Sequence, residues 1–109
     1  MDISIDDFKK VEITVGEIVS ADNIEGSDKL LKLKVNFGEL GERQVLSGIA
    51  KFFPDPMMLV GRRVPFVTNL APRQMMGLES QAMILATGGE GEVPLFLFDT
   101  TAPPGSKVR

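Results

Sequence analysis

Hydrophobic and polar residues alternate most regularly in the segment from residue 31 to residue 37. Its apolar members are Leu31, Leu33, Val35 and Phe37. Side chains two residues apart share one face of a strand, so the pattern predicts a strand with one buried face. A turn at residues 38–42 and a strand at residues 43–49 complete a predicted hairpin. We expect the outer face of this hairpin to carry three cations, Lys32, Lys34 and Arg43.

The segment before this hairpin combines a helix signal with a long strand. Ser4-Ile5-Asp6-Asp7 resembles a capping box with Asp in place of Glu, which predicts a short helix through residues 8–10. Residues 11–19 alternate again and predict a strand. Gly16 interrupts this strand and is expected to allow a bulge, because it has no Cβ.

The rest of the chain reads as short strands separated by Gly and Pro. A helical turn is expected at residues 57–60, and a loop at residues 73–78. Further strands are expected at residues 63–70, 79–87 and 93–98, with a turn at residues 88–91 and a Pro/Gly-rich tail at residues 101–109.

About six short strands with a helical turn after the third predict an all-β domain spanning residues 1–109. The pattern favours an OB-fold, a five-stranded Greek-key barrel, with a short N-terminal helix and a C-terminal strand extension. A small β-sandwich is the alternative. We prefer the barrel because a sandwich rarely needs the interruption at Gly16 or the helical turn.

Composition excludes several classes of chemistry. The chain has no Cys and no His, so it has no disulfide, no Cys/His zinc site, no thiol nucleophile and no imidazole base. We expect no catalysis, cofactor or metal. A carboxylate-based hydrolase using Glu79 or Asp99 is a remote alternative. No apolar run approaches the ~18 residues of a membrane span, and a polar N-terminus favours the cytoplasm.

Charge is distributed unevenly along the chain, although the net charge is only −3. Residues 1–28 have a balance of −6, residues 29–73 of +5 and residues 74–109 of −2. OB barrels bind ligands across their second and third strands and the flanking loops. The basic segment coincides with that expected face, where Lys29 and Arg73 lie in the flanking loops. A chance cluster of solvated charges is the other interpretation.

The chain resembles the tRNA-binding domain family, found at the C-terminus of many methionyl-tRNA synthetases and as a free-standing structure-specific tRNA-binding protein. The resemblance covers nearly the whole chain. It rests on Ile5-Asp6-Asp7-Phe8-Lys9-Lys10-Val11-Glu12, Val15-Gly16, Gly26-Ser27-Asp28-Lys29-Leu30, Arg43, Ser47-Gly48-Ile49, Val60-Gly61-Arg62, Asn69-Leu70-Ala71-Pro72-Arg73, Met75, Gly77, Ser80-Gln81-Ala82-Met83, Pro104-Gly105 and Val108.

The resemblance implies a dimeric OB barrel that binds the outer corner of tRNA through shape and backbone. The RNA-contacting positions it implies are Lys29, Arg43, Asn69, Arg73, Ser80 and Met83. Lys32 and Lys34 join them from the hairpin face. Three positions have structural alternatives: Asn69 as a turn residue, Ser80 as a strand hydroxyl and Met83 as core filling.

The expected partners are tRNA and a second copy of the chain, the latter through residues 93–108. The chain could be free-standing or linked to a synthetase catalytic domain. The alternative function is that of a secretion-related chaperone of the same barrel family, which binds unfolded polypeptide. RNA binding should weaken steeply with salt, whereas apolar peptide binding should survive it.

Overall fold

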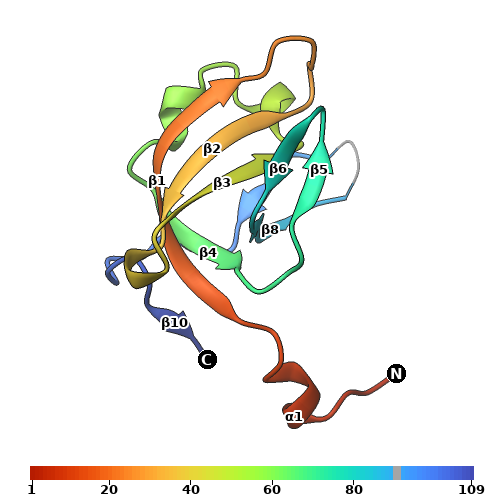
Figure 1. Cartoon of the computed structure of the whole chain (residues 1–109), viewed down its shortest axis with the longest axis vertical. Helices are drawn as coiled ribbons and strands as arrows, with labels where there is room; N and C mark the ends of the chain where they lie inside the picture. Colours follow the sequence, from red (N-terminus) through yellow and green to blue (C-terminus); the bar gives the residue numbers. More distant parts are fainter. Residues whose placement is uncertain (90–91) are drawn as a thin grey trace.

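The computed structural model describes residues 1–89 and 92–109, and its centre is a curled antiparallel sheet (Figure 1). The strands follow the order β3-β2-β1-β4-β7, and β10 pairs with the first part of β1. Their bounds are β1 Ile13–Asn23, β2 Leu31–Asn36, β3 Glu42–Ser47, β4 Arg63–Val67, β7 Met83–Ile84 and β10 Lys107–Val108.

Short elements complete the fold. One α-helix begins after Ser4, whose hydroxyl accepts a hydrogen bond from the Asp7 amide (3.1 Å). This cap confirms the predicted helix signal, although the helix ends at Phe8. The helices are α1 Ile5–Phe8, η1 Gly38–Leu40, η2 Ala50–Phe52 and η3 Pro56–Leu59, and the two small sheets pair β5 Arg73–Met75 with β6 Leu78–Ser80, and β8 Ala86–Thr87 with β9 Leu95–Phe96.

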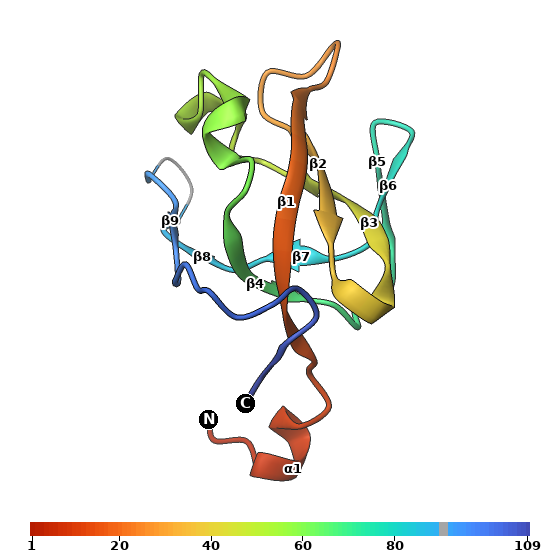
Figure 2. The same ribbon diagram turned by 90° about the vertical axis from the view of Figure 1, so that its left-hand side faces the viewer.

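The sheet closes toward a barrel through side-chain and backbone hydrogen bonds between β3 and the segment that joins β6 to β7. The Gln81 amide donates to the Gln44 carbonyl (2.8 Å), and the Gln44 amide donates to Gln81 Oε1 (2.9 Å). The predicted all-β OB-type barrel is therefore confirmed, and the β-sandwich alternative is wrong. Helix α1 and both chain ends lie at one end of this barrel, and the β1–β2 loop lies at the other (Figure 2).

The predicted core stripe is buried as expected. Leu31, Leu33, Val35 and Phe37 have no exposed surface. Phe37 meets Phe66 edge to face, with ring centroids 5.2 Å apart. The alternation of residues 31–37 therefore reports the burial of one face of β2.

Gly16 has a different role from the one predicted. It pairs regularly with Val64, and the irregular register lies between Ile18 and Ser20. A Cβ at Gly16 would lie 2.5 Å from Val35 Cγ1 and 2.6 Å from Phe37 Cε1. The position needs glycine because the core packs against its backbone, and the bulge occurs beyond it.

The second half of the chain is more finely divided than predicted. The expected loop at residues 73–78 forms part of the β5–β6 hairpin, whose two turn residues, Met76 and Gly77, have φ angles of 52° and 76°. Two positive φ angles are typical of a type I′ hairpin turn. The expected strand at residues 79–87 is split among β6, β7 and β8. The turn expected at residues 88–91 includes two positions outside the described residues.

Candidate nucleic-acid interface

Lys29 stands at the end of the β1–β2 loop and is exposed. Its amide donates to Ser27 Oγ (3.3 Å), and its carbonyl accepts from the Ala50 amide (3.0 Å). A Cβ placed on Gly26 in the same loop would lie 3.7 Å from Met76 Cε at the tip of the β5–β6 hairpin. The loop that holds Lys29 and the hairpin that holds Arg73 therefore approach each other.

Arg73 and Met83 flank the outer side of β3. Together with Leu46 and Leu70 they line a small hollow of about 70 Å³ under the β5–β6 hairpin. Arg73 is exposed, and Met83 keeps 46% of its surface exposed. Core filling therefore does not describe Met83, because nearly half of it faces solvent.

Lys32 and Lys34 project from the outer face of β2, as predicted. Lys34 is exposed, and its Nζ lies 3.8 Å from Glu42 Oε1. Lys32 is half-buried and stands opposite Asp22 in the β1–β2 register. The outer face of the hairpin thus carries acidic residues beside its cations, so the charge segregation along the chain is only partly preserved in space.

Arg43 does not lie on that outer face, which corrects the sequence prediction. It is two residues from buried Val45 and opposite buried Val35, so it shares their side of the sheet. Its Nη1 donates to the Thr68 carbonyl (2.7 Å) and lies 3.4 Å from the Gln81 carbonyl. The guanidinium carbon stands 5.8 Å from the centre of the Phe37 ring. Arg43 therefore stabilises one end of the barrel by linking β3 to the segments after β4 and β6.

Asn69 and Ser80 both use their side chains inside the structure. Asn69 Oδ1 accepts from the Glu12 amide (2.8 Å), and Asn69 Nδ2 donates to the Lys10 carbonyl (2.6 Å). Asn69 therefore holds a distant segment and is not a turn residue bonded to its own backbone. Ser80 is buried, and its hydroxyl accepts from the Leu46 amide (3.0 Å) and donates to the Ala82 carbonyl (3.2 Å). Of the two interpretations of Ser80, this geometry agrees with a strand hydroxyl that is hydrogen-bonded within the fold.

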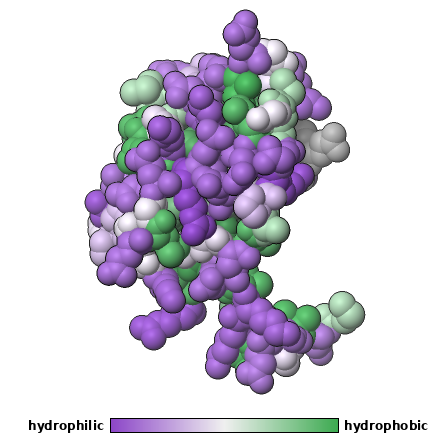
Figure 3. Space-filling view, viewed as in Figure 1, coloured by the Kyte–Doolittle hydropathy of each residue, from purple (hydrophilic) through white to green (hydrophobic). Residues whose placement is uncertain are grey.

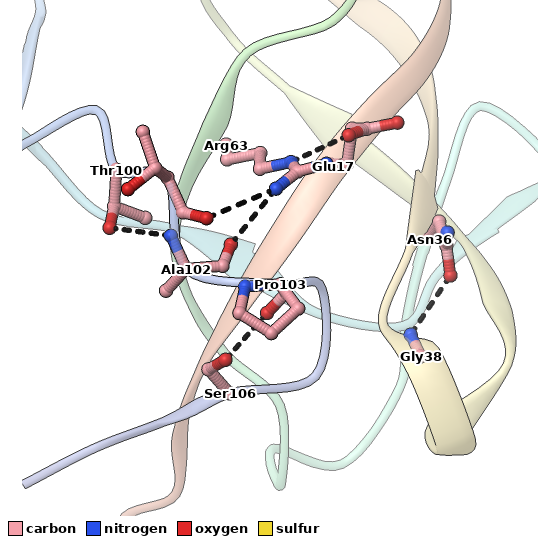
Figure 4. Close-up of polar contacts among 9 residues, drawn as sticks. Glu17, Asn36, Gly38, Arg63, Thr100, Ala102, Pro103 and Ser106 are labelled. Carbon is pink, nitrogen blue, oxygen red and sulfur yellow. Dashed lines mark hydrogen bonds and ion pairs between the residues drawn. The ribbon is translucent and has the colours of Figure 1, made fainter.

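Two further cations of the basic segment are paired away from the hairpin face. Arg63 Nε donates to Glu17 Oε1 (2.7 Å), and its Nη1 lies 3.3 Å from the carbonyls of Thr101 and Ala102 (Figure 4). Arg62 forms an ion pair with Asp99. The hydrogen bonds from Arg62 lower the pKa of the Asp99 carboxyl, burial opposes this shift, and the charge of Arg62 adds to the lowering.

Lys51 belongs to the basic segment of residues 29–73, but it was not among the RNA-contacting residues predicted from the sequence. It is exposed in η2, directly after Ala50, whose amide is bonded to the carbonyl of Lys29. Local patterning contains no signal for this contact, because the two lysines are separated by strands β2 and β3.

The surface around the β5–β6 hairpin is largely hydrophilic, with separate hydrophobic areas (Figure 3). Within residues 1–89 and 92–109, no group of three or more acidic side chains could hold a metal ion. The same part of the chain has no helix long and apolar enough to span a bilayer.

The barrel, the exposed cations and the apolar side chains next to them define a class of protein. Lys29 and Arg73 stand on the two segments that flank β2 and β3, the region that OB barrels use to bind oligonucleotides. The molecule is therefore built as an OB-type nucleic-acid-binding domain.

Comparison with known proteins gives the family. The chain belongs to the tRNA-binding domain family: the family described as "Putative tRNA binding domain" matches residues 13–107. The chain is 45% identical over 106 residues to a methionine–tRNA ligase of Caldanaerobacter subterraneus subsp. tengcongensis. The match covers 97% of this chain and 16% of the ligase. The chain thus spans about a sixth of the length of this relative.

Solved structures agree with the fold. A MetRS-related protein from Pyrococcus horikoshii superimposes with a TM-score of 0.89 at 34% sequence identity, over 100% of both chains. The chaperone CsaA from Bacillus anthracis str. Ames superimposes with a TM-score of 0.87 at 24% identity, again over 100% of both chains. At the lower identity the likeness shows the fold alone.

Proposed function

We propose that the chain binds tRNA as a non-catalytic module, through the outer face of β2 and β3. The observation that carries this proposal is the position of two exposed cations, Lys29 and Arg73, on the two segments that flank this face. Lys32 pairs with Leu46 in the β2–β3 register, and Leu46 lines the same small hollow as Arg73 and Met83. We call Lys29, Lys32, Arg73 and Met83 the hairpin surface, after the β2–β3 hairpin beside which they lie. It leaves out Arg43, Asn69 and Ser80, whose polar groups bind the chain itself.

The hairpin surface suits contact with the RNA backbone. Lysine and arginine neutralise phosphates and release counterions, which makes the affinity dependent on salt and largely independent of sequence. Because the surface consists of cationic and apolar side chains, recognition of shape is favoured over recognition of sequence. We expect a dissociation constant on the order of a micromolar at physiological salt, since much of the binding is electrostatic.

We infer the cellular role from the relatives, of whose length this chain matches about a sixth. A tRNA-binding module joined to, or associated with, a methionine–tRNA ligase raises the local concentration of tRNA at that enzyme. This role requires no catalysis by the chain itself, and we expect it to be carried out in the cytoplasm.

A homodimer through residues 93–108 would present two hairpin surfaces. Val93, Leu95 and Leu97 are exposed by 64%, 65% and 52%, respectively. Phe96 between them stacks inward on Phe53, with ring centroids 5.8 Å apart. Apolar side chains on the outward face of such a strand favour an association of two copies. Sedimentation of the parent and of a Leu95→Asp variant checks this, and an unchanged oligomeric state contradicts it.

The experiment that tests tRNA binding is a fluorescence-anisotropy titration with labelled tRNA at about 50 mM and about 200 mM salt. Lys29→Ala and Arg73→Ala should each weaken binding severalfold and lower the salt slope by about one unit. Lys107→Ala is the matched control, because Lys107 is exposed in β10 at the opposite end of the barrel. Equal binding by all four proteins contradicts the hairpin surface.

The same titration addresses the chaperone alternative, which the structural likeness to CsaA supports at the level of the fold. An unfolded, uncharged polypeptide should not compete with tRNA. If the polypeptide does compete with tRNA and its binding persists at high salt, the apolar residues on the outer face of β2 and β3 bind polypeptide, as the chaperone alternative requires.

A further inference from the structure

Lys29 and Lys51 form a pair of neighbouring cations, of which Lys51 lies outside the hairpin surface. The hydrogen bond between the Lys29 carbonyl and the Ala50 amide places their backbones next to each other. Both side chains are exposed, and neither makes an ion pair within residues 1–89 and 92–109. Two unneutralised ammonium groups on adjacent backbone segments are a suitable site for one phosphate.

An open trough of about 570 Å³ begins at this pair of lysines. Its volume lies within the range of pockets that hold small molecules, about 300–1,000 Å³. The apolar part of its lining consists of Ile49, Phe52, Ile84, Ala86 and Pro94. Ser47 belongs to the same lining, and Glu92 supplies the carboxylate among the described lining residues.

The geometry points to this trough as a binding site for one nucleoside monophosphate unit. The phosphate would lie between Lys29 and Lys51, and the base would lie on the apolar lining, next to the half-buried ring of Phe52. A base can stack on an aromatic ring whatever its identity, so this site does not need to select a sequence. A purely apolar ligand would leave both lysines without a partner.

The unit has two possible sources, an unpaired nucleotide of a bound RNA and a free nucleotide. The RNA source rests on the proposed tRNA binding, and it is supported by the position of Lys29, which belongs both to the trough and to the hairpin surface. In that arrangement one RNA chain passes from the hairpin surface into the trough. Lys51 is then a further RNA-contacting residue.

The test is a titration of the isotope-labelled chain with adenosine 5′-monophosphate, followed by amide chemical shifts. The shifts should change at residues 47–52 and 84–87 and stay unchanged at the tip of the β5–β6 hairpin. Lys51→Ala should weaken binding by at least about fivefold, whereas Lys107→Ala should leave it unchanged. Ribose 5-phosphate, which has no base, should bind more weakly than the nucleotide.

A second arm uses a short single-stranded RNA. If RNA is the source, the oligonucleotide should bind more tightly than the monophosphate and should produce the same trough shifts. Equal affinities favour the free nucleotide. Trough shifts that are absent at millimolar concentration, or equal in the parent and Lys51→Ala, overturn the inference.

The outcome is independent of the proposed function. Arg73→Ala should weaken tRNA binding and leave the monophosphate shifts intact. If tRNA binding fails and the monophosphate still binds, the proposed function is wrong and the trough remains a nucleotide site. If tRNA binds as proposed and Lys51→Ala changes neither ligand, only the inference about the trough is wrong.

Discussion

Arg62 forms two hydrogen bonds with the carboxylate of Asp99: Nε to Oδ1 at 2.8 Å and Nη2 to Oδ2 at 2.7 Å. The same guanidinium lies over the ring of Phe96, with its carbon 4.5 Å from the ring centre. Arg62 precedes β4, whereas Phe96 and Asp99 belong to the C-terminal segment. This bidentate pair therefore ties the C-terminal segment to the barrel.

The pair predicts a dependence of stability on pH. Arg62 lowers the pKa of Asp99 in the folded chain below its ordinary value of 3.8. A carboxyl with a lower pKa in the folded state stabilises the fold above its unfolded pKa and loses that contribution as the pH falls through its folded pKa. Asp99→Asn should therefore be less stable than the parent near neutral pH, and the difference should shrink below about pH 4.

Chemical denaturation of both proteins at several pH values checks this prediction. Asp28→Asn is the matched control, because Asp28 is exposed and makes no ion pair within residues 1–89 and 92–109. Asp28→Asn should follow the parent at each pH. A stability difference for Asp99→Asn that stays constant down to about pH 2 would contradict the role of the pair.

Ser80 should matter for stability rather than for RNA contact. Ser80→Ala removes the acceptor of the buried Leu46 amide, and an unpaired buried donor costs about 1–3 kcal/mol. Thermal or chemical unfolding measures this loss. Ser20→Ala removes a half-buried hydroxyl for which the described residues offer no hydrogen bond, so it should be nearly neutral. If Ser80→Ala unfolds like the parent but binds tRNA several times more weakly, the hydroxyl contacts RNA.

Arg43 gives a parallel prediction for a charged side chain. Arg43→Met keeps most of the stem beside Phe37 and removes the hydrogen bond to the Thr68 carbonyl, which should cost about 1–3 kcal/mol of stability. The salt slope of tRNA binding should stay the same, because the guanidinium faces the barrel end. If Arg43→Met lowers the salt slope of tRNA binding as much as Arg73→Ala does, Arg43 contacts RNA after all.

Strands could be predicted from the sequence where one face of the strand is buried and the other is exposed. Leu31, Leu33, Val35 and Phe37 alternate with polar residues because β2 has one face in the core. The β5–β6 hairpin was missed because its turn places Met76 at a positive φ, which a residue with a Cβ seldom adopts. Local patterning therefore gave a loop where a type I′ turn forms.

The candidate site was predictable only in part. Arg43 and Val45 differ by two positions, so the alternation that places Val45 in the core also places Arg43 on that side. The roles of Asn69 and Ser80 depend on partners 57 and 34 residues away in the sequence. Such contacts leave no periodic signal, whereas Lys29 and Arg73 follow from the loops that flank an OB-type binding face.

Gly16 tests the packing of the barrel itself. An added Cβ would meet Val35, Phe37 and Phe66 at 2.5–2.9 Å, and these side chains belong to the closely packed core. Gly16→Ala should therefore cost about 1–3 kcal/mol through overpacking. Gly48→Ala is the matched control, because a Cβ there meets no atom within 4 Å, and it should change stability by less than about 0.5 kcal/mol.

Chemical denaturation of the two alanine variants separates packing from the general effect of replacing glycine. Neither position has a positive φ, so backbone strain does not contribute to the difference between the variants, and the packing around the new Cβ is the main difference that remains. If Gly16→Ala is as stable as Gly48→Ala, the backbone of β1 can move away from β2 and β4 at no cost. In that case the close approach at Gly16 would not be what holds the barrel at its observed curvature.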